Sequence, residues 1–396
     1  MGVALACLPL CIAVPTLAMA ADGPPVGGGG PPAGTVTGPP AGTATTPPAG
    51  IPTGPQQSGV TPSGPPSGIP TGGPPAGVPS GGVPSNLGSL TPSGLAGLDP
   101  STFAGLTATQ LDALKPSALS GISADQLANL KPASLGSLSA SQFSALPPSA
   151  MAGLKPAQLG AMAPSGIKGM TAEMFDAIPA SAMSALTFDQ MLALKPAVLQ
   201  QVSAEQIAAM SSQVMGALSK DQLARIPAEA ITALKAGQLD RLSPEAFPGF
   251  SPEQFMDLKP AILSVIDPKQ FVGLKPAVLG VMTAEQFAAF TPATVKSIKL
   301  PQIDSLAPAA LAGMSGADIK SLSDAKIAKL DAEQISNLQP TTFASMKPSQ
   351  LAAMAPADVP GMTGEQLAAL SPKQADALKP AVINTMNAEQ RAALAQ

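Results

Sequence analysis

Large apolar residues recur with a fixed period along most of the chain. From Leu90 onward every eighth residue is Leu, Ile, Met, Val or Phe, and this register holds for 38 consecutive octapeptides without an insertion or deletion. A second large apolar residue occupies the sixth position of each octapeptide and fails only at Ala375 and Arg391. A fixed period of this kind predicts a repeat architecture in place of an ordinary globular domain.

The spacing inside each octapeptide predicts helix rather than strand. Apolar positions are separated by five and then three residues, which breaks the strict alternation of a half-buried strand. The three-residue step places two side chains on one helix face. Position two is Ser, Thr, Asp or Asn in 21 octapeptides, and these residues cap helix N-termini. Gln often follows three residues later, as at Ser123/Gln126 and Ser251/Gln254, which predicts capping boxes.

Proline and small residues predict where each helix begins and ends. Position three is Pro in 20 octapeptides, which suits a first helical turn and prevents a helix from continuing out of the preceding unit. Octapeptides that begin Leu-Lys-Pro often precede those with a capping box, as in 194–209 and 274–289, so the pattern predicts a pair of helices as the structural unit. Isolated helices this short are marginal, so their stability must come from stacking. We therefore predict an all-α, elongated solenoid over 90–396, with one short capped helix per octapeptide.

The N-terminal part of the chain predicts export and a linker. Residues 1–20 are mostly apolar and end in a small-x-small triplet, which predicts a signal peptide cleaved after Ala20 and no membrane span thereafter. Residues 21–89 are mostly Pro, Gly, Thr, Ser and Val, which predicts a disordered linker. An O-glycosylated stalk and a ligand for proline-binding modules are the alternatives for this segment. The expected location is the periplasm, the cell surface or the medium.

Composition narrows the classes of function. The chain has no His, Trp or Tyr, and both cysteines, Cys7 and Cys11, lie in the predicted signal peptide. The usual general base, the commonest metal ligand and thiol nucleophiles are therefore missing from the mature chain. Asp and Glu occur mainly at position four, in the exposed first helical turn, where they favour the helix dipole. We predict no catalytic residue, no cofactor and no metal site. The absence of basic runs and stacking aromatic residues argues against nucleic acid as a partner.

Lysine supplies the one candidate interaction surface. Ten octapeptides carry Lys at position two: Lys115, Lys131, Lys155, Lys195, Lys235, Lys259, Lys275, Lys299, Lys347 and Lys379. These residues are interpreted either as solubilising charges where the chain turns before Pro, or as a periodic edge that contacts an anionic glycan or cell-wall polymer.

Several octapeptides resemble those of known extracellular proteins. LSPEAFPG at 242–249, FSPEQFMD at 250–257 and IDPKQFVG at 266–273 resemble the octapeptide-spaced segments of the mesothelin, stereocilin and otoancorin family, and LTxxQIxxL units of large bacterial surface proteins are similar. The resemblance covers about three quarters of the chain. It implies an extracellular superhelical array used for adhesion or scaffolding. The chain departs from mesothelin in lacking Tyr, Trp and a cysteine in its mature part, so eukaryotic ancestry and lipid anchoring are not implied.

These observations predict a non-enzymatic, exported scaffold that binds a protein or an envelope or matrix polymer. The alternative is a binding module for an anionic envelope polymer along the lysine edge.

Overall fold

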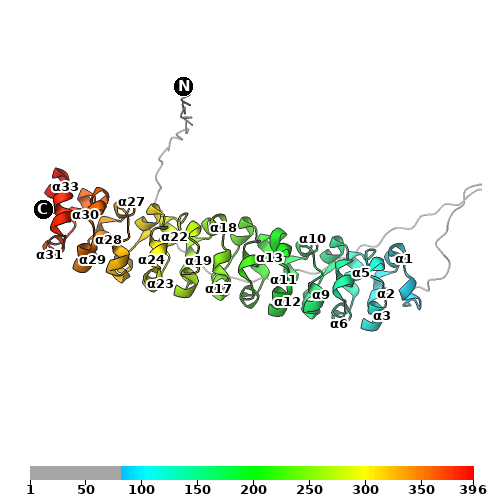
Figure 1. The fold of residues 1–396 in the computed structure, drawn as a ribbon. Coiled ribbons are helices and arrows are strands. Elements are labelled where there is room, and N and C mark those ends of the chain that lie inside the picture. Colours follow the sequence, from blue (N-terminus) through cyan, green and yellow to red (C-terminus); the bar gives the residue numbers. More distant parts are fainter. Residues whose placement is uncertain (1–81) are drawn as a thin grey trace, which may run out of the picture. The chain divides into compact units, whose positions relative to one another are not determined.

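The computed structural model describes residues 82–396, and within them every regular element is a helix. The predicted signal peptide, 1–20, and most of the predicted linker, 21–89, lie outside the described residues. The all-α repeat fold predicted from the octapeptide pattern is confirmed. The helices follow one another in chain order from α1 to α33 (Figure 1).

Each octapeptide contributes one short helix, and six elements are 3-10 helices. The elements are η1 Leu87–Ser89, α1 Pro92–Ala96, α2 Pro100–Phe103, α3 Ala108–Asp112, α4 Pro116–Leu119, α5 Ala124–Asn129, α6 Pro132–Leu135, α7 Ala140–Ser144, η2 Pro148–Gly153, α8 Pro156–Ala161, α9 Pro164–Ile167, α10 Ala172–Asp176, α11 Ala180–Met183, α12 Phe188–Ala193, η3 Pro196–Gln201, α13 Ala204–Ala209, α14 Ser212–Met215, α15 Lys220–Leu223, α16 Ala228–Ile231, α17 Ala236–Arg241, η4 Phe247–Gly249, α18 Pro252–Met256, α19 Pro260–Leu263, α20 Pro268–Phe271, α21 Pro276–Leu279, α22 Ala284–Ala288, α23 Pro292–Ser297, α24 Leu300–Ile303, η5 Pro308–Gly313, α25 Gly316–Ser321, α26 Asp324–Ile327, α27 Ala332–Ser336, α28 Pro340–Phe343, α29 Pro348–Ala353, η6 Pro356–Gly361, α30 Gly364–Ala368, α31 Pro372–Ala375, α32 Pro380–Thr385 and α33 Ala388–Leu394.

The predicted capping boxes are present. At the start of α5, Gln126 N donates to Ser123 Oγ at 3.2 Å, and Ser123 N donates to Gln126 Oε1 at 3.0 Å. Two of the four free N–H groups at the helix start are satisfied in this way. The helix ends at Leu130, whose backbone is extended with φ −65° and ψ 142°. The apolar residue at position one therefore closes one helix and leads into the next.

Helices stack in three columns, and the stacking partner is the third octapeptide along the chain. Helix α1 packs on α4, α4 on α7 and α7 on α9, and partners such as α1 and α4 begin three octapeptides apart, at Pro92 and Pro116. Helices α2 and α3 start two further columns, because α2 packs on α5 and α3 on α6. One turn of the array therefore holds three octapeptides, and the predicted two-octapeptide unit is not the stacking unit.

The two apolar positions of each octapeptide form one continuous core between the columns. Leu95 at position six and Leu98 at position one are 0% and 6% exposed, and this pattern continues through Phe343 and Met346. Aromatic rings meet edge to face where they adjoin, as in Phe271 and Phe290, whose centroids are 4.9 Å apart. Two octapeptides lack a large apolar residue at position six, and there the residue is not buried in the core: Ala375 is half-buried and Arg391 is exposed.

Glycine at position eight lets stacked backbones touch. A Cβ added to Gly313 in η5 would lie 1.9 Å from the carbonyl oxygen of Ala284 in α22, and one added to Gly121 would lie 2.0 Å from that of Pro92. Such contacts exclude any side chain. Glycine is required here by close approach of the backbones and not by a left-handed backbone conformation.

The ordered array begins before the predicted boundary at Leu90. Helix η1 covers Leu87–Ser89, and Leu87 is 7% exposed. Val83 is also packed against the core. The prediction that the linker continues to residue 89 is therefore wrong for these residues. Leu87 and Val83 cover apolar surface of the first turn, which otherwise has a stacking partner on one side only.

Candidate functional site

All ten position-two lysines are exposed, and the stacking decides which of them are neighbours. Lys131 and Lys155 precede α6 and α8, which pack on each other. Lys235 and Lys259 precede α17 and α19, which also pack on each other. These two pairs are brought together by the three-octapeptide turn.

The remaining lysines are divided among the columns. Lys115 and Lys379 belong to the column of α1, Lys195 to the column of α2, and Lys275, Lys299 and Lys347 to the column of α3. Lys275 and Lys299 are three octapeptides apart and therefore lie on adjacent turns of that column. Lysines in octapeptides two units apart, such as Lys115 and Lys131, fall on different columns because stacking joins every third octapeptide. The structure therefore arranges the predicted edge as local pairs and single charges on three columns.

Some lysines have a partner inside the array. Lys235 Nζ donates to Ala208 O at 2.8 Å, at the end of the helix one turn earlier. Lys326 Nζ donates in the same way to Lys296 O at 2.6 Å, and burial, followed by the neighbouring charge of Lys296, lowers the pKa of Lys326. A cation near the carbonyl end of a helix is stabilising. For Lys235, this contact favours the interpretation as a structural charge.

The acidic residues at position four lie on the exterior. The pKa of four of these carboxyl groups is lowered because each accepts a hydrogen bond from its own backbone N–H and a second one from the capping hydroxyl; they are Glu173, Glu205, Glu253 and Glu285. They are exposed and well separated along the chain. Within 82–396 no three carboxylates, histidines or cysteines approach closely enough to hold a metal ion together.

The most regular polar feature was missed from the sequence. Glutamines at position five, all buried except the half-buried Gln374, reach across to the preceding turn, and we call them the Gln clamps. They are Gln126, Gln142, Gln158, Gln190, Gln206, Gln222, Gln238, Gln254, Gln270, Gln286, Gln302, Gln334, Gln350, Gln366, Gln374 and Gln390. In Gln254, Nε2 donates to Leu223 O at 2.9 Å and to Ile226 O at 2.6 Å, while Oε1 accepts from Ser251 N at 2.9 Å.

A Gln clamp connects the start of one helix to the end of another. The Leu223 carbonyl belongs to the last residue of α15, where backbone carbonyls have no partner within the helix. The sequence feature that indicates this role is the repeated choice of Gln, with its amide group, at position five. A capping box accepts Glu as well as Gln, and the helix dipole favours Glu, so repeated Gln indicates that a donor is needed.

Two clamp positions carry a carboxylate instead. Asp318 and Asp358 are 3% and 6% exposed. Each accepts from the backbone N–H at the start of its own octapeptide, from Ser315 at 2.8 Å and from Ala355 at 2.6 Å. Burial raises the pKa of Asp358, the hydrogen bond from Ala355 opposes this, and the Asp331 carboxylate raises it further.

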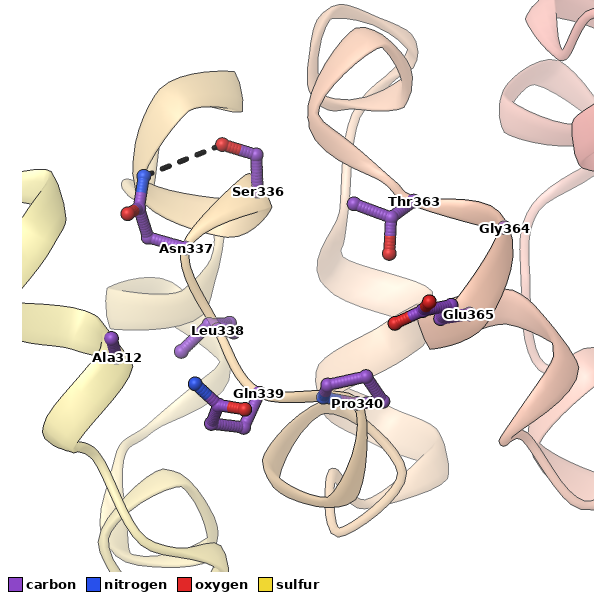
Figure 2. A pocket seen from close by; sticks show the side chains of 9 residues that line it. All are labelled: Ala312, Ser336, Asn337, Leu338, Gln339, Pro340, Thr363, Gly364 and Glu365. Carbon is purple, nitrogen blue, oxygen red and sulfur yellow. Dashed lines mark hydrogen bonds between the residues drawn. The ribbon is translucent and has the colours of Figure 1, made fainter. Parts of the chain in front are cut away.

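One surface pocket lies where α27, α28 and α30 meet (Figure 2). Its volume is about 630 Å³, and Glu365 and Thr363 face Asn337, Gln339 and Pro340 across it. Asn337 is held in place because its amide donates to Glu333 O at 2.9 Å. Glu365 is the single ionisable side chain that lines the pocket, whereas glycoside hydrolysis uses a pair of carboxylates.

A second pocket adjoins the most unusual apolar residues of the exterior. It has a volume of about 410 Å³ and is lined by residues of α12 and α14, including Phe188, Asp189 and Gln213. Phe188 is 38% exposed and Leu192, one turn further along α12, is 56% exposed. The other ten phenylalanines are buried in the core, as predicted from their positions.

None of the helices in the described part of the chain has the length and apolar character needed to cross a membrane. Comparison with known proteins finds no protein-family model and no curated protein that matches the chain.

Proposed function

We propose that this chain is an exported, non-enzymatic scaffold that acts at the cell envelope or outside the cell by presenting a repetitive surface to a protein or a matrix polymer. The octapeptide resemblance to extracellular adhesion and scaffold proteins points the same way. The predicted signal peptide supplies the route of export.

The observation that carries this proposal is the three-column array. The same backbone geometry recurs on the exterior of the array at every third octapeptide. The exterior positions two, three, four, seven and eight carry mostly small or polar side chains. A partner with its own repeat can therefore contact several turns at once. Weak contacts repeated in this way add up to firm attachment when the geometry of both partners matches.

The alternative is a module that binds an anionic envelope polymer. The pair Lys131/Lys155 favours it, since it places two exposed lysines on stacked helices, whereas in the pair Lys235/Lys259 the Lys235 ammonium already donates to Ala208 O. Such binding is electrostatic and is screened by salt. Because the whole chain has a net charge of −4, the attraction of an anionic polymer must come from local lysine pairs.

Pull-down of envelope fractions with the full-length mature chain tests both functions. A scaffold that binds through its repeated exterior retains its partner in about 0.5 M salt, where the Debye length is only about 4 Å. A polymer-binding module releases its partner there, and Lys131→Gln/Lys155→Gln weakens it at low salt. Lys168→Gln/Lys320→Gln removes the same charge from exposed positions outside the pairs and serves as the control. Retention of no envelope component above the level of an unrelated exported protein contradicts both proposals.

A further inference from the structure

Polar side chains at position five act as hydrogen-bond donors to the preceding turn. The Gln clamps donate to a carbonyl 28 residues earlier, and hydroxyl groups do the same where the residue is Ser or Thr. Ser134 Oγ donates to Leu106 O at 2.8 Å, and Thr342 Oγ1 donates to Met314 O at 2.7 Å. Where position five carries Gln, Ser or Thr beyond the first turn, its side chain therefore supplies a proton to a carbonyl oxygen at the corner of the array.

Asp318 is one of two carboxylates at this position, and an ionised carboxylate has no proton to donate. Its Oδ2 accepts from Ser315 N at 2.8 Å and from the Ser315 hydroxyl, so it performs the role of a clamp Oε1. Its Oδ1 occupies the role of the clamp nitrogen and is buried without a hydrogen-bond partner in the described residues. The carbonyls equivalent to those that a clamp contacts are those of Phe287 and Phe290, 31 and 28 residues earlier.

We propose that the Asp318 corner binds a hard cation, with Asp318 Oδ1 and the carbonyl oxygens of Phe287 and Phe290 as its protein ligands. The Asp side chain is one methylene shorter than Gln, so its Oδ1 reaches less far toward these carbonyls than the Nε2 of a Gln clamp does. A carboxylate combined with backbone carbonyls is a ligand set typical of Ca²⁺, and Na⁺ shares this chemistry. Mg²⁺ fits less well, since it keeps most of its water.

The negative charge of the Asp318 carboxylate favours a bound cation at this corner. A buried carboxylate without a compensating partner is strongly unfavourable. One carboxylate is a small charge for a Ca²⁺ site, so the affinity belongs in the range of extracellular modules, about 10⁻⁴–10⁻³ M. Asp358 is a second buried carboxylate at the same position, in η6, and the Asp331 carboxylate is close enough to raise its pKa, but Asp358 has no buried oxygen without a partner. The inference does not depend on the proposed scaffold function.

Thermal unfolding and calorimetric titration of the full chain test the site. We expect 10 mM CaCl2 to raise the melting temperature by about 2 °C or more above choline chloride of equal ionic strength. A NaCl series at the same ionic strength separates Na⁺ from Ca²⁺. Because Asp358 is a second carboxylate corner, the comparison is made between Asp358→Gln and Asp318→Gln/Asp358→Gln.

The Asp318 substitution in that background must abolish the cation response while the fold is kept, because Gln is the residue found at the other clamps. Asp376→Asn removes an exposed carboxylate and must leave the response unchanged. A response that survives in the double variant overturns the proposal. So does a wild-type chain whose melting temperature is insensitive to both Ca²⁺ and Na⁺.

Discussion

At the scale of the residue, the amide group of each Gln clamp is the most informative choice in the sequence. It accepts one backbone hydrogen bond at the start of its own helix and donates two to the end of another, as in Gln254. Both the amide oxygen and the amide nitrogen of Gln254 are therefore hydrogen-bonded within the protein. A buried network is stabilising only when its members are satisfied in this way.

Gln254→Glu tests the donor role. Glu keeps the acceptor for Ser251 N but places a carboxylate against the Leu223 and Ile226 carbonyls, so we expect a loss of about 3 kcal/mol in the free energy of unfolding, since each buried carbonyl without a donor costs about 1–3 kcal/mol. Urea unfolding followed by circular dichroism measures it. Gln213→Glu makes the same chemical change at an exposed position four, where acids are common, and should be neutral. Equal stability of the two variants would rule out the clamp.

At the scale of the element, each helix is too short to be stable alone. How closely helices of adjacent turns can pack depends on the size of the residues between them. Capping groups, Pro in the first turn and the extended residue at position one set the length of the helix. Contact with the next turn then depends on small residues. In the stacking of η5 on α22, Gly313 lies against the carbonyl of Ala284, and a side chain there would have no space.

Gly313→Ala should therefore destabilise the array by about 1–3 kcal/mol, the usual cost of inserting a methyl group into a close-packed contact. Gly364→Ala is the matched control. A Cβ at Gly364 would meet its nearest neighbour, Ala393 Cβ, at 3.8 Å, which is an ordinary contact, and Ala in place of Gly in a helix is favourable. Thermal melting of both variants gives the comparison. The prediction fails if Gly313→Ala melts no lower than Gly364→Ala.

At the scale of the whole array, stability comes from contacts between one turn and the next. An octapeptide contacts the octapeptides three before and three after it, so residues 82–396 behave as a one-dimensional chain of interfaces. All octapeptides share the same apolar positions, and a shift of one whole unit exchanges stacking partners without exposing the core. A shift of half a unit moves the apolar residues to the outside.

Deletions of different length separate these two cases. Removal of 258–265, one octapeptide, should leave a single cooperative thermal transition. Removal of 258–261 places every later octapeptide out of register with the preceding turn. It should divide unfolding into two transitions or lower its midpoint by more than about 5 °C, as expected for a loss above about 2–3 kcal/mol at one interface. Differential scanning calorimetry distinguishes these outcomes. Similar traces for both deletions would mean that the octapeptide register does not govern stacking.

Features that depend on contacts within one or two octapeptides could be predicted from the amino-acid sequence. The core positions, the helix in each unit, the capping at residues such as Ser123 and the burial of Phe103 all follow from spacing and side-chain chemistry, and all are confirmed. The number of octapeptides in one turn, three, could not be predicted in this way, because the angle between successive helices depends on packing against the third octapeptide along the chain. That choice makes Lys131 and Lys155 neighbours, separates Lys115 from Lys131, and turns Gln254 from a local cap into a link between turns.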